Sequence, residues 1–142
     1  METEKNALKT DNYLSYFYSP ELTAYEFLKS FFACLKKQNV DKAGRDISGF
    51  LYDQKKKLQD IVALKEIRFR NNGIFWYSND IEDALFNLQN GGLLGKTNPS
   101  FGVILIKYTD EEADNIIKNT PVNCIDDIKK IAMDYLDGIG TN

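Results

Sequence analysis

Histidine is absent from this chain of 142 residues, and only 2 cysteines and 3 prolines are present. Without histidine, the chain cannot form a Ser-His-Asp or Cys-His catalytic arrangement or a histidine-ligated metal site. Cys34 and Cys124 each lie among apolar residues at helical spacing. This spacing predicts two buried, reduced thiols, with a disulfide or a reactive thiol as the alternative. No apolar run is long enough to cross a bilayer, so we expect no membrane partner.

Catalysis would have to use carboxylates, lysine, tyrosine or cysteine. The acidic clusters fall where we expect first turns of helices, and carboxylates are typical there because they face the positive end of the helix dipole. These clusters lie at residues 80–83, 110–114 and 126–127. None has the spacing of a calcium loop, and no serine lies in a nucleophile elbow. We therefore expect a protein that is not an enzyme and that uses no cofactor and no metal.

Apolar residues make up 43% of the chain, enough for a hydrophobic core in one domain. We expect this domain to cover residues 19–142, after an aromatic lead-in at residues 1–18 that packs on the domain or on a partner. The polar first six residues lack the features of a signal peptide, so we expect a cytoplasmic protein. Basic residues exceed acidic ones only at residues 41–72, with 8 against 5, whereas residues 73–142 hold 5 against 11.

The apolar periodicity predicts a mainly helical α+β domain with a small antiparallel sheet. A first helix is expected to begin at Ser19-Pro20-Glu21 or at the capping box Thr23-x-x-Glu26, and to end near residue 39. A second helical stretch is expected at residues 41–64, as one helix or as two that break near Gly44 and Gly49. The strand formers of residues 67–77, interrupted by Asn71-Asn72-Gly73, predict a hairpin, or one strand with a loop before it.

The second half of the chain predicts three helices and two strands. A helix is expected at residues 80–90, with Asp80 or Asn79 as its N-cap and Gly91 as a left-handed C-cap. Strands are expected at residues 93–94 and 103–108, joined by a loop. Thr109 is expected to cap the next helix, and a last helix is expected at about residues 125–136.

The segment Gly95-Lys96-Thr97 matches the second half of a phosphate-binding loop, but Asn90 stands where that loop has its first glycine. A phosphate-binding loop needs a strand before it and a helix after it, so that backbone amides and the helix N-terminus converge on the phosphate. Here the expected helix comes first and the strand follows, and Pro99 disfavours a helix after Thr97. We therefore expect no nucleotide partner.

Residues 79–117 resemble the second half of a winged-helix domain in their pattern of side-chain sizes. The matching positions are Leu85, Leu88, Gly92, Leu93, Leu94, Thr109 and Ala113. The resemblance implies a winged-helix-like fold, in which a two-stranded wing follows the third helix. It also implies that this helix and the wing form a contact surface. The strand-like Ile74–Ser78 departs from the family, which has a short helix before the third one.

The outer face of the helix at residues 80–90 carries acids and amides but no base, so DNA would repel it. We therefore expect a non-enzymatic protein-interaction or regulatory module, with a protein partner or self-association. Its contact candidates on this helix are Glu82, Asp83, Phe86, Asn87 and Asn90, and those on the wing are Lys96, Asn98 and Phe101.

The alternative is a DNA-binding transcriptional regulator that uses the basic segment at residues 42–70 and the wing. Its candidate contacts are Lys55, Lys56, Lys57, Arg68 and Arg70. Phe69 and Trp76 could stack on bases if they are exposed. If the three consecutive lysines instead form an ordinary solvated helix face and the aromatic residues are core, this alternative loses its support.

Overall fold

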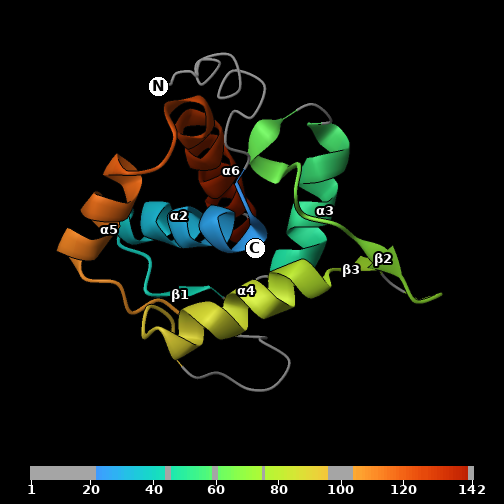
Figure 1. Cartoon of the computed structure of the whole chain (residues 1–142), viewed down its shortest axis with the longest axis horizontal. Coiled ribbons are helices and arrows are strands. Elements are labelled where there is room, and N and C mark those ends of the chain that lie inside the picture. Colours follow the sequence, from blue (N-terminus) through green and yellow to red (C-terminus); the bar gives the residue numbers. More distant parts are fainter. Residues whose placement is uncertain (1–21, 44–45, 59–60, 75, 96–103, 141–142) are drawn as a thin grey trace, which may run out of the picture.

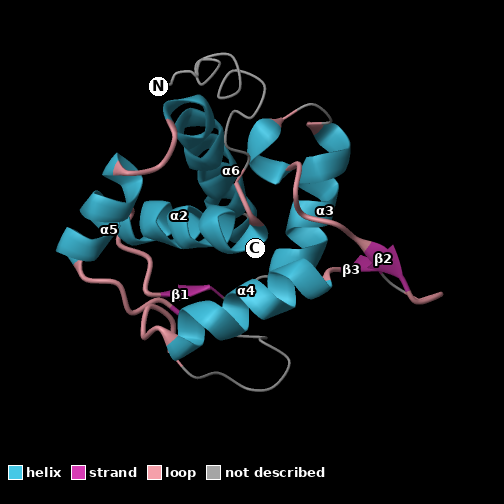
Figure 2. Cartoon of the chain, viewed as in Figure 1, coloured by secondary structure: helices cyan, strands magenta, loops and turns pink. Residues whose placement is uncertain are grey.

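The computed structural model describes residues 22–43, 46–58, 61–74, 76–95 and 104–140. Five α-helices and two small antiparallel sheets make up these parts, which confirms the expected mainly helical α+β class. Figure 1 shows α2 (Ala24–Lys37) at the centre, with α4, α5 and α6 around it. The strands form two separate short pairs, one below α2 and one at the edge of the molecule (Figure 2).

Helix α2 begins at the capping box that the sequence predicts. The Thr23 side chain accepts a hydrogen bond from the Glu26 amide, and Glu26 Oε1 accepts one from the Thr23 amide at 3.1 Å. The helix ends in a Schellman motif, in which the Val40 amide bonds to the Leu35 carbonyl and Asn39 adopts a φ of 64°. Ser19-Pro20-Glu21, the other predicted start, lies outside the described residues.

The stretch expected at residues 41–64 as one helix, or as two that break near Gly44 and Gly49, is α-helical only in its middle. The chain first forms strand β1 (Lys42–Ala43), then α3 (Ile47–Lys57), and after residues 59–60 a short 3-10 helix, η1 (Val62–Leu64). Gly49 lies inside α3 and does not break it. Strand β1 exists because it pairs with β4 (Ile104–Leu105), a partner that is remote in the sequence.

The predicted hairpin is confirmed as strands β2 (Arg70–Asn71) and β3 (Trp76–Tyr77). Two consecutive asparagine side chains build its turn: Asn71 Oδ1 accepts from the Gly73 amide, and Asn72 Oδ1 accepts from the Ile74 amide. Gly73 supplies the positive φ of 95° that this turn requires. Figure 1 shows the hairpin projecting from the helical body beside α3.

Helix α4 (Asn79–Asn90) corrects two predictions about helix ends. Its N-cap is Ser78, whose side chain accepts from the Ile81 amide, so neither Asn79 nor Asp80 caps it. At the other end, Gly91 keeps a right-handed backbone, and Gly92 takes the left-handed position at φ 83°. The Leu93 amide then bonds to the Leu88 carbonyl, which completes a Schellman motif one residue later than predicted.

Of the two strands predicted around the loop, the second forms β4, whereas the first contributes only an isolated bridge at Leu94. Leu94 forms an antiparallel bridge with Ile106, and the Gly95 amide donates to the Leu105 carbonyl at 2.9 Å. Strand β1 joins the other side of this ladder, where it pairs with β4. The loop residues 96–103 lie outside the described part of the chain.

Helix α5 (Asp110–Lys118) begins at the predicted Thr109, which forms a capping box with Glu112. Helix α6 (Val122–Gly140) starts earlier and ends later than the predicted residues 125–136. The inner faces of both helices pack on α2. A buried pair of hydroxyls, Ser30 Oγ and Thr120 Oγ1 at 2.7 Å, joins α2 to the segment between α5 and α6.

An aromatic cluster forms the centre of the core. Phe31 of α2 contacts Phe27 and Phe32 of its own helix, Phe50 of α3 and Tyr135 of α6, with ring centroids 5.4–6.5 Å apart. Phe31 is fully buried. In the parts that the structure describes, no helix combines the length and apolarity needed to span a membrane.

Both cysteines are buried as free thiols, as the sequence predicts. Burial raises the pKa of the Cys34 thiol to about 11, and burial also raises the pKa of Cys124. The thiolate is the reactive form, and a raised pKa lowers its fraction. The thiols of the folded protein should therefore not react with a disulfide reagent such as dithiobisnitrobenzoate at about pH 8. In concentrated guanidinium chloride both thiols should react. Rapid labelling of one thiol in the folded protein would contradict this prediction.

Candidate functional site

The outer side of α4 carries five exposed side chains in one stripe, here called the α4 stripe: Glu82, Asp83, Phe86, Asn87 and Asn90. Their spacing of three and four residues places them on one side of the helix. The opposite side buries Ile81, Ala84, Leu85 and Leu88, as the periodicity predicts. Phe86 is 52% exposed, and its aromatic ring lies among the two carboxylates and two amides of the stripe.

A shallow groove of about 280 Å³ lies beside the α4 stripe. Asp83 and Asn87 line it from α4, and Tyr25 lines it from the start of α2. Glu66 and Asp80 add further carboxylates, and Arg68 adds one guanidinium. The groove therefore has an excess of negative charge next to the exposed Phe86 ring.

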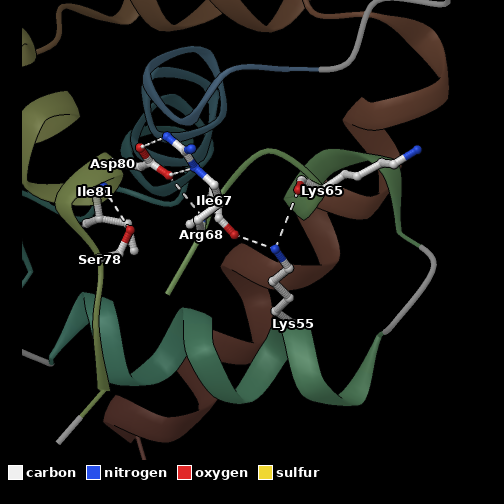
Figure 3. Close-up of polar contacts among 7 residues, drawn as sticks. All are labelled: Lys55, Lys65, Ile67, Arg68, Ser78, Asp80 and Ile81. Carbon is white, nitrogen blue, oxygen red and sulfur yellow. Dashed lines mark hydrogen bonds and ion pairs between the residues drawn. The ribbon is translucent and has the colours of Figure 1, made fainter. Parts of the chain in front are cut away.

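Arg68, one of the predicted DNA contacts, forms an intramolecular ion pair at the surface, where its side chain is 80% exposed. Its Nε donates to Asp80 Oδ2 and its Nη2 donates to Asp80 Oδ1, both at 3.1 Å, and its backbone amide also donates to Oδ2 (Figure 3). The side-chain hydrogen bond from Arg68 lowers the pKa of Asp80 and outweighs the opposing effect of partial burial. This contact joins the segment before the hairpin to the first turn of α4.

Lys55, another predicted DNA contact, is also engaged. Its ammonium donates to the Ile67 carbonyl and, at 3.5 Å, to the Lys65 carbonyl, so it ties α3 to the following segment (Figure 3). The remaining three candidates, Lys56, Lys57 and Arg70, are exposed. The five cations therefore do not form one free basic surface.

An aromatic stack between α3 and the hairpin is a feature that the sequence did not predict. Tyr52 of α3 stacks on Trp76 of β3, with centroids 4.9 Å apart and planes at 15°, and its edge meets Phe69 at 5.5 Å. The Lys56 ammonium lies 5.5 Å from the Tyr52 centroid. We call Tyr52, Phe69 and Trp76 the aromatic platform. Trp76 remains 43% exposed, and nearby Ile74 is 90% exposed.

The wing candidates Lys96, Asn98 and Phe101 lie outside the described residues, so their positions relative to α4 stay predictions. The described base of the wing includes Gly95, whose backbone lies close to the neighbouring strand. A Cβ atom at Gly95 would be 2.9 Å from Leu105 Cβ. Close strand packing therefore accounts for this glycine without a phosphate.

No protein-family model, curated protein or solved structure matches this chain. The candidate functional surfaces are therefore the two exposed ones, the α4 stripe and the aromatic platform. Among the described residues, no group of three or more cysteine, aspartate or glutamate side chains could hold a metal ion.

The Arg68–Asp80 contact predicts a specific dependence of stability on pH. The pKa of Asp80 is lower in the folded protein than in the unfolded chain, so this contact stabilises the fold above the unfolded pKa of about 3.9. The contribution is lost as pH falls through the lower, folded pKa. Because the pair is near the surface, Asp80→Asn should reduce the free energy of unfolding by only about 0.5–1 kcal/mol at neutral pH.

Urea unfolding of Asp80→Asn and wild type at neutral pH and near pH 3 measures this effect. The difference between the two proteins should shrink at the lower pH, while Asp83→Asn, one turn further along the same helix, should differ little from wild type at either pH. A constant difference across this range would show that the charge of Asp80 is not its source.

Proposed function

We propose that the chain is a non-enzymatic protein-interaction or regulatory module of winged-helix character, with the α4 stripe as its contact surface. The element order supports the winged-helix part of the proposal: α2, β1, α3 and α4 are followed by the paired segments at Leu94 and β4. The β2–β3 hairpin is inserted between α3 and α4. Strand β1 pairs with β4, so the wing would belong to a sheet with a third strand.

One observation carries the functional part: Phe86 is 52% exposed in the middle of a helix whose outer side bears Glu82 and Asp83. Partly exposed aromatic residues are frequent energetic centres of protein interfaces. The adjacent groove is lined by carboxylates of Glu66, Asp80 and Asp83. The partner that this surface fits has an apolar pocket for Phe86 and a lysine or arginine that enters the groove.

Affinity capture from the native host tests the proposal with three tagged proteins: wild type, Phe86→Ala and Val122→Ala. Val122 is a matched control because it is an exposed aliphatic residue at the start of α6. We expect a partner that wild type and Val122→Ala retain and that Phe86→Ala loses. Equal capture by all three proteins would contradict the use of the α4 stripe.

Self-association through the same stripe would appear as a dimer in sedimentation experiments. Such a dimer should dissociate more readily in Phe86→Ala than in Val122→Ala. If wild type stays monomeric and captures no partner that depends on Phe86, the proposed function is wrong.

A further inference from the structure

The aromatic platform is partly exposed to solvent at the edge of the fold. Tyr52 covers one face of the Trp76 indole, yet 43% of Trp76 is exposed, so the ring is not enclosed in the core. Ile74 lies in the turn of the hairpin, two residues before Trp76, and is 90% exposed. Two large apolar side chains of one hairpin are therefore exposed to solvent, and this hairpin projects from the helices (Figure 1).

Exposing these apolar side chains costs free energy, and no contact among the described residues explains why they are exposed. The stack of Phe69, Tyr52 and Trp76 already holds the hairpin against α3. That structural role would be met by the covered face of Trp76 alone. Exposed aromatic faces that extend an ordered stack are suited to receive another planar group, because ring stacking requires little rearrangement.

The charges around the platform favour an anionic partner. Lys56 lies over Tyr52, and Lys57 and Arg70 are exposed on the elements that carry the platform. Asp53 and Glu66 are exposed in the same region, but Lys65 and the ion-paired Arg68 are exposed there as well. A planar group to stack on Trp76 and a phosphate near Lys56 are both present in a nucleotide chain.

We propose that the aromatic platform binds single-stranded nucleic acid, with a base stacked on the open face of Trp76 and the backbone phosphates beside Lys56. This site is separate from the α4 stripe and uses neither the wing nor α4. A duplex fits it poorly, because bases inside a duplex are already stacked on each other. The site is small and holds one or two bases, so binding depends on stacking and on few phosphates.

Trp76 is the only tryptophan of the chain, so its fluorescence reports on this site alone. We expect an unlabelled oligothymidylate to quench it at low salt. If three cations contact phosphates, a plot of the logarithm of the affinity against the logarithm of the salt concentration has a slope of about −2. A fourfold rise in salt then weakens binding roughly 20-fold.

Fluorescence anisotropy of a labelled oligothymidylate gives the affinities of variants. Trp76→Leu should weaken binding by about 5-fold to 150-fold, the range expected for losing one base stack. Lys56→Glu should weaken it and reduce the salt dependence, and Lys118→Glu, an exposed lysine on α5, should change it less than about twofold. Circular dichroism checks that each variant is folded; if Trp76→Leu does not fold, Lys56→Ala and Ile74→Ala are measured instead.

Several results would overturn the proposal. These are the absence of quenching at low salt, equal affinity of wild type and Trp76→Leu, and tighter binding of a blunt duplex than of either of its strands. Quenching by polyglutamate or by a proline-rich peptide, without quenching by the oligothymidylate, would assign the platform to a protein partner instead. The Phe86→Ala protein should bind the oligothymidylate normally, so this test is independent of the α4 stripe.

Discussion

Replacing Phe31 by alanine is expected to lower the free energy of unfolding by about 3–5 kcal/mol. The ring is fully buried and contacts four other aromatic rings, from α2, α3 and α6. Its removal takes away apolar burial and leaves a cavity that the surrounding rings cannot fill without moving. Because small proteins are stable by only about 5–15 kcal/mol, this single change should bring the protein close to unfolding.

Urea unfolding followed by circular dichroism measures this effect, with Phe86→Ala as the matched control. Both variants remove the same atoms, but Phe86 is 52% exposed, so its removal should cost at most about 1 kcal/mol. If Phe31→Ala is not folded, Phe31→Leu should still fold and lose about 1–2 kcal/mol. Similar losses for Phe31→Ala and Phe86→Ala would show that the aromatic cluster does not form the core of the protein in solution.

Gly95→Ala is expected to lower the free energy of unfolding by about 1–3 kcal/mol. The added Cβ would lie 2.9 Å from Leu105 Cβ and 3.2 Å from Lys107 Cδ, so the ladder between the Leu94 segment and β4 would have to open. Gly91→Ala is the control, since its Cβ would come no closer than 3.4 Å to the Asn87 carbonyl oxygen. It should therefore be tolerated with a small change.

A comparison of Gly95→Ala with Lys96→Ala separates packing from phosphate binding at Gly95. If Gly95-Lys96-Thr97 bound a nucleotide, Lys96→Ala and Gly95→Ala would both reduce the affinity. We expect calorimetry to detect no ATP binding by wild type or by either variant. Measurable ATP binding that Lys96→Ala abolishes would show that the interpretation of Gly95 as a packing glycine is incomplete.

Features with a local cause were predictable from the sequence. The capping boxes at Thr23 and Thr109 each need only two side chains three residues apart, and both form. The hairpin turn follows from consecutive asparagines and a glycine, and the buried side of α4 follows from helical periodicity. The α4 stripe, as the complement of that buried side, was therefore predictable too.

Features with a distant cause were not predictable. Lys42–Ala43 forms a strand only because residues 104–105 lie beside it, and no local sequence pattern predicts that pairing. Asp80 does not cap α4 because Arg68, twelve residues earlier, holds its carboxylate, and Ser78 takes the cap instead. The exposure of Trp76 likewise depends on how the hairpin lies against α3.

The central position of α2 has a consequence during protein synthesis. This helix lies early in the chain, but α4, α5 and α6, which cover it, follow much later. Phe31 can meet Phe50 once α3 has been made, but it cannot meet Tyr135 until α6 has emerged. The apolar side of α2 therefore stays partly uncovered until α6 has been synthesised, and during that interval it can associate with other apolar surfaces.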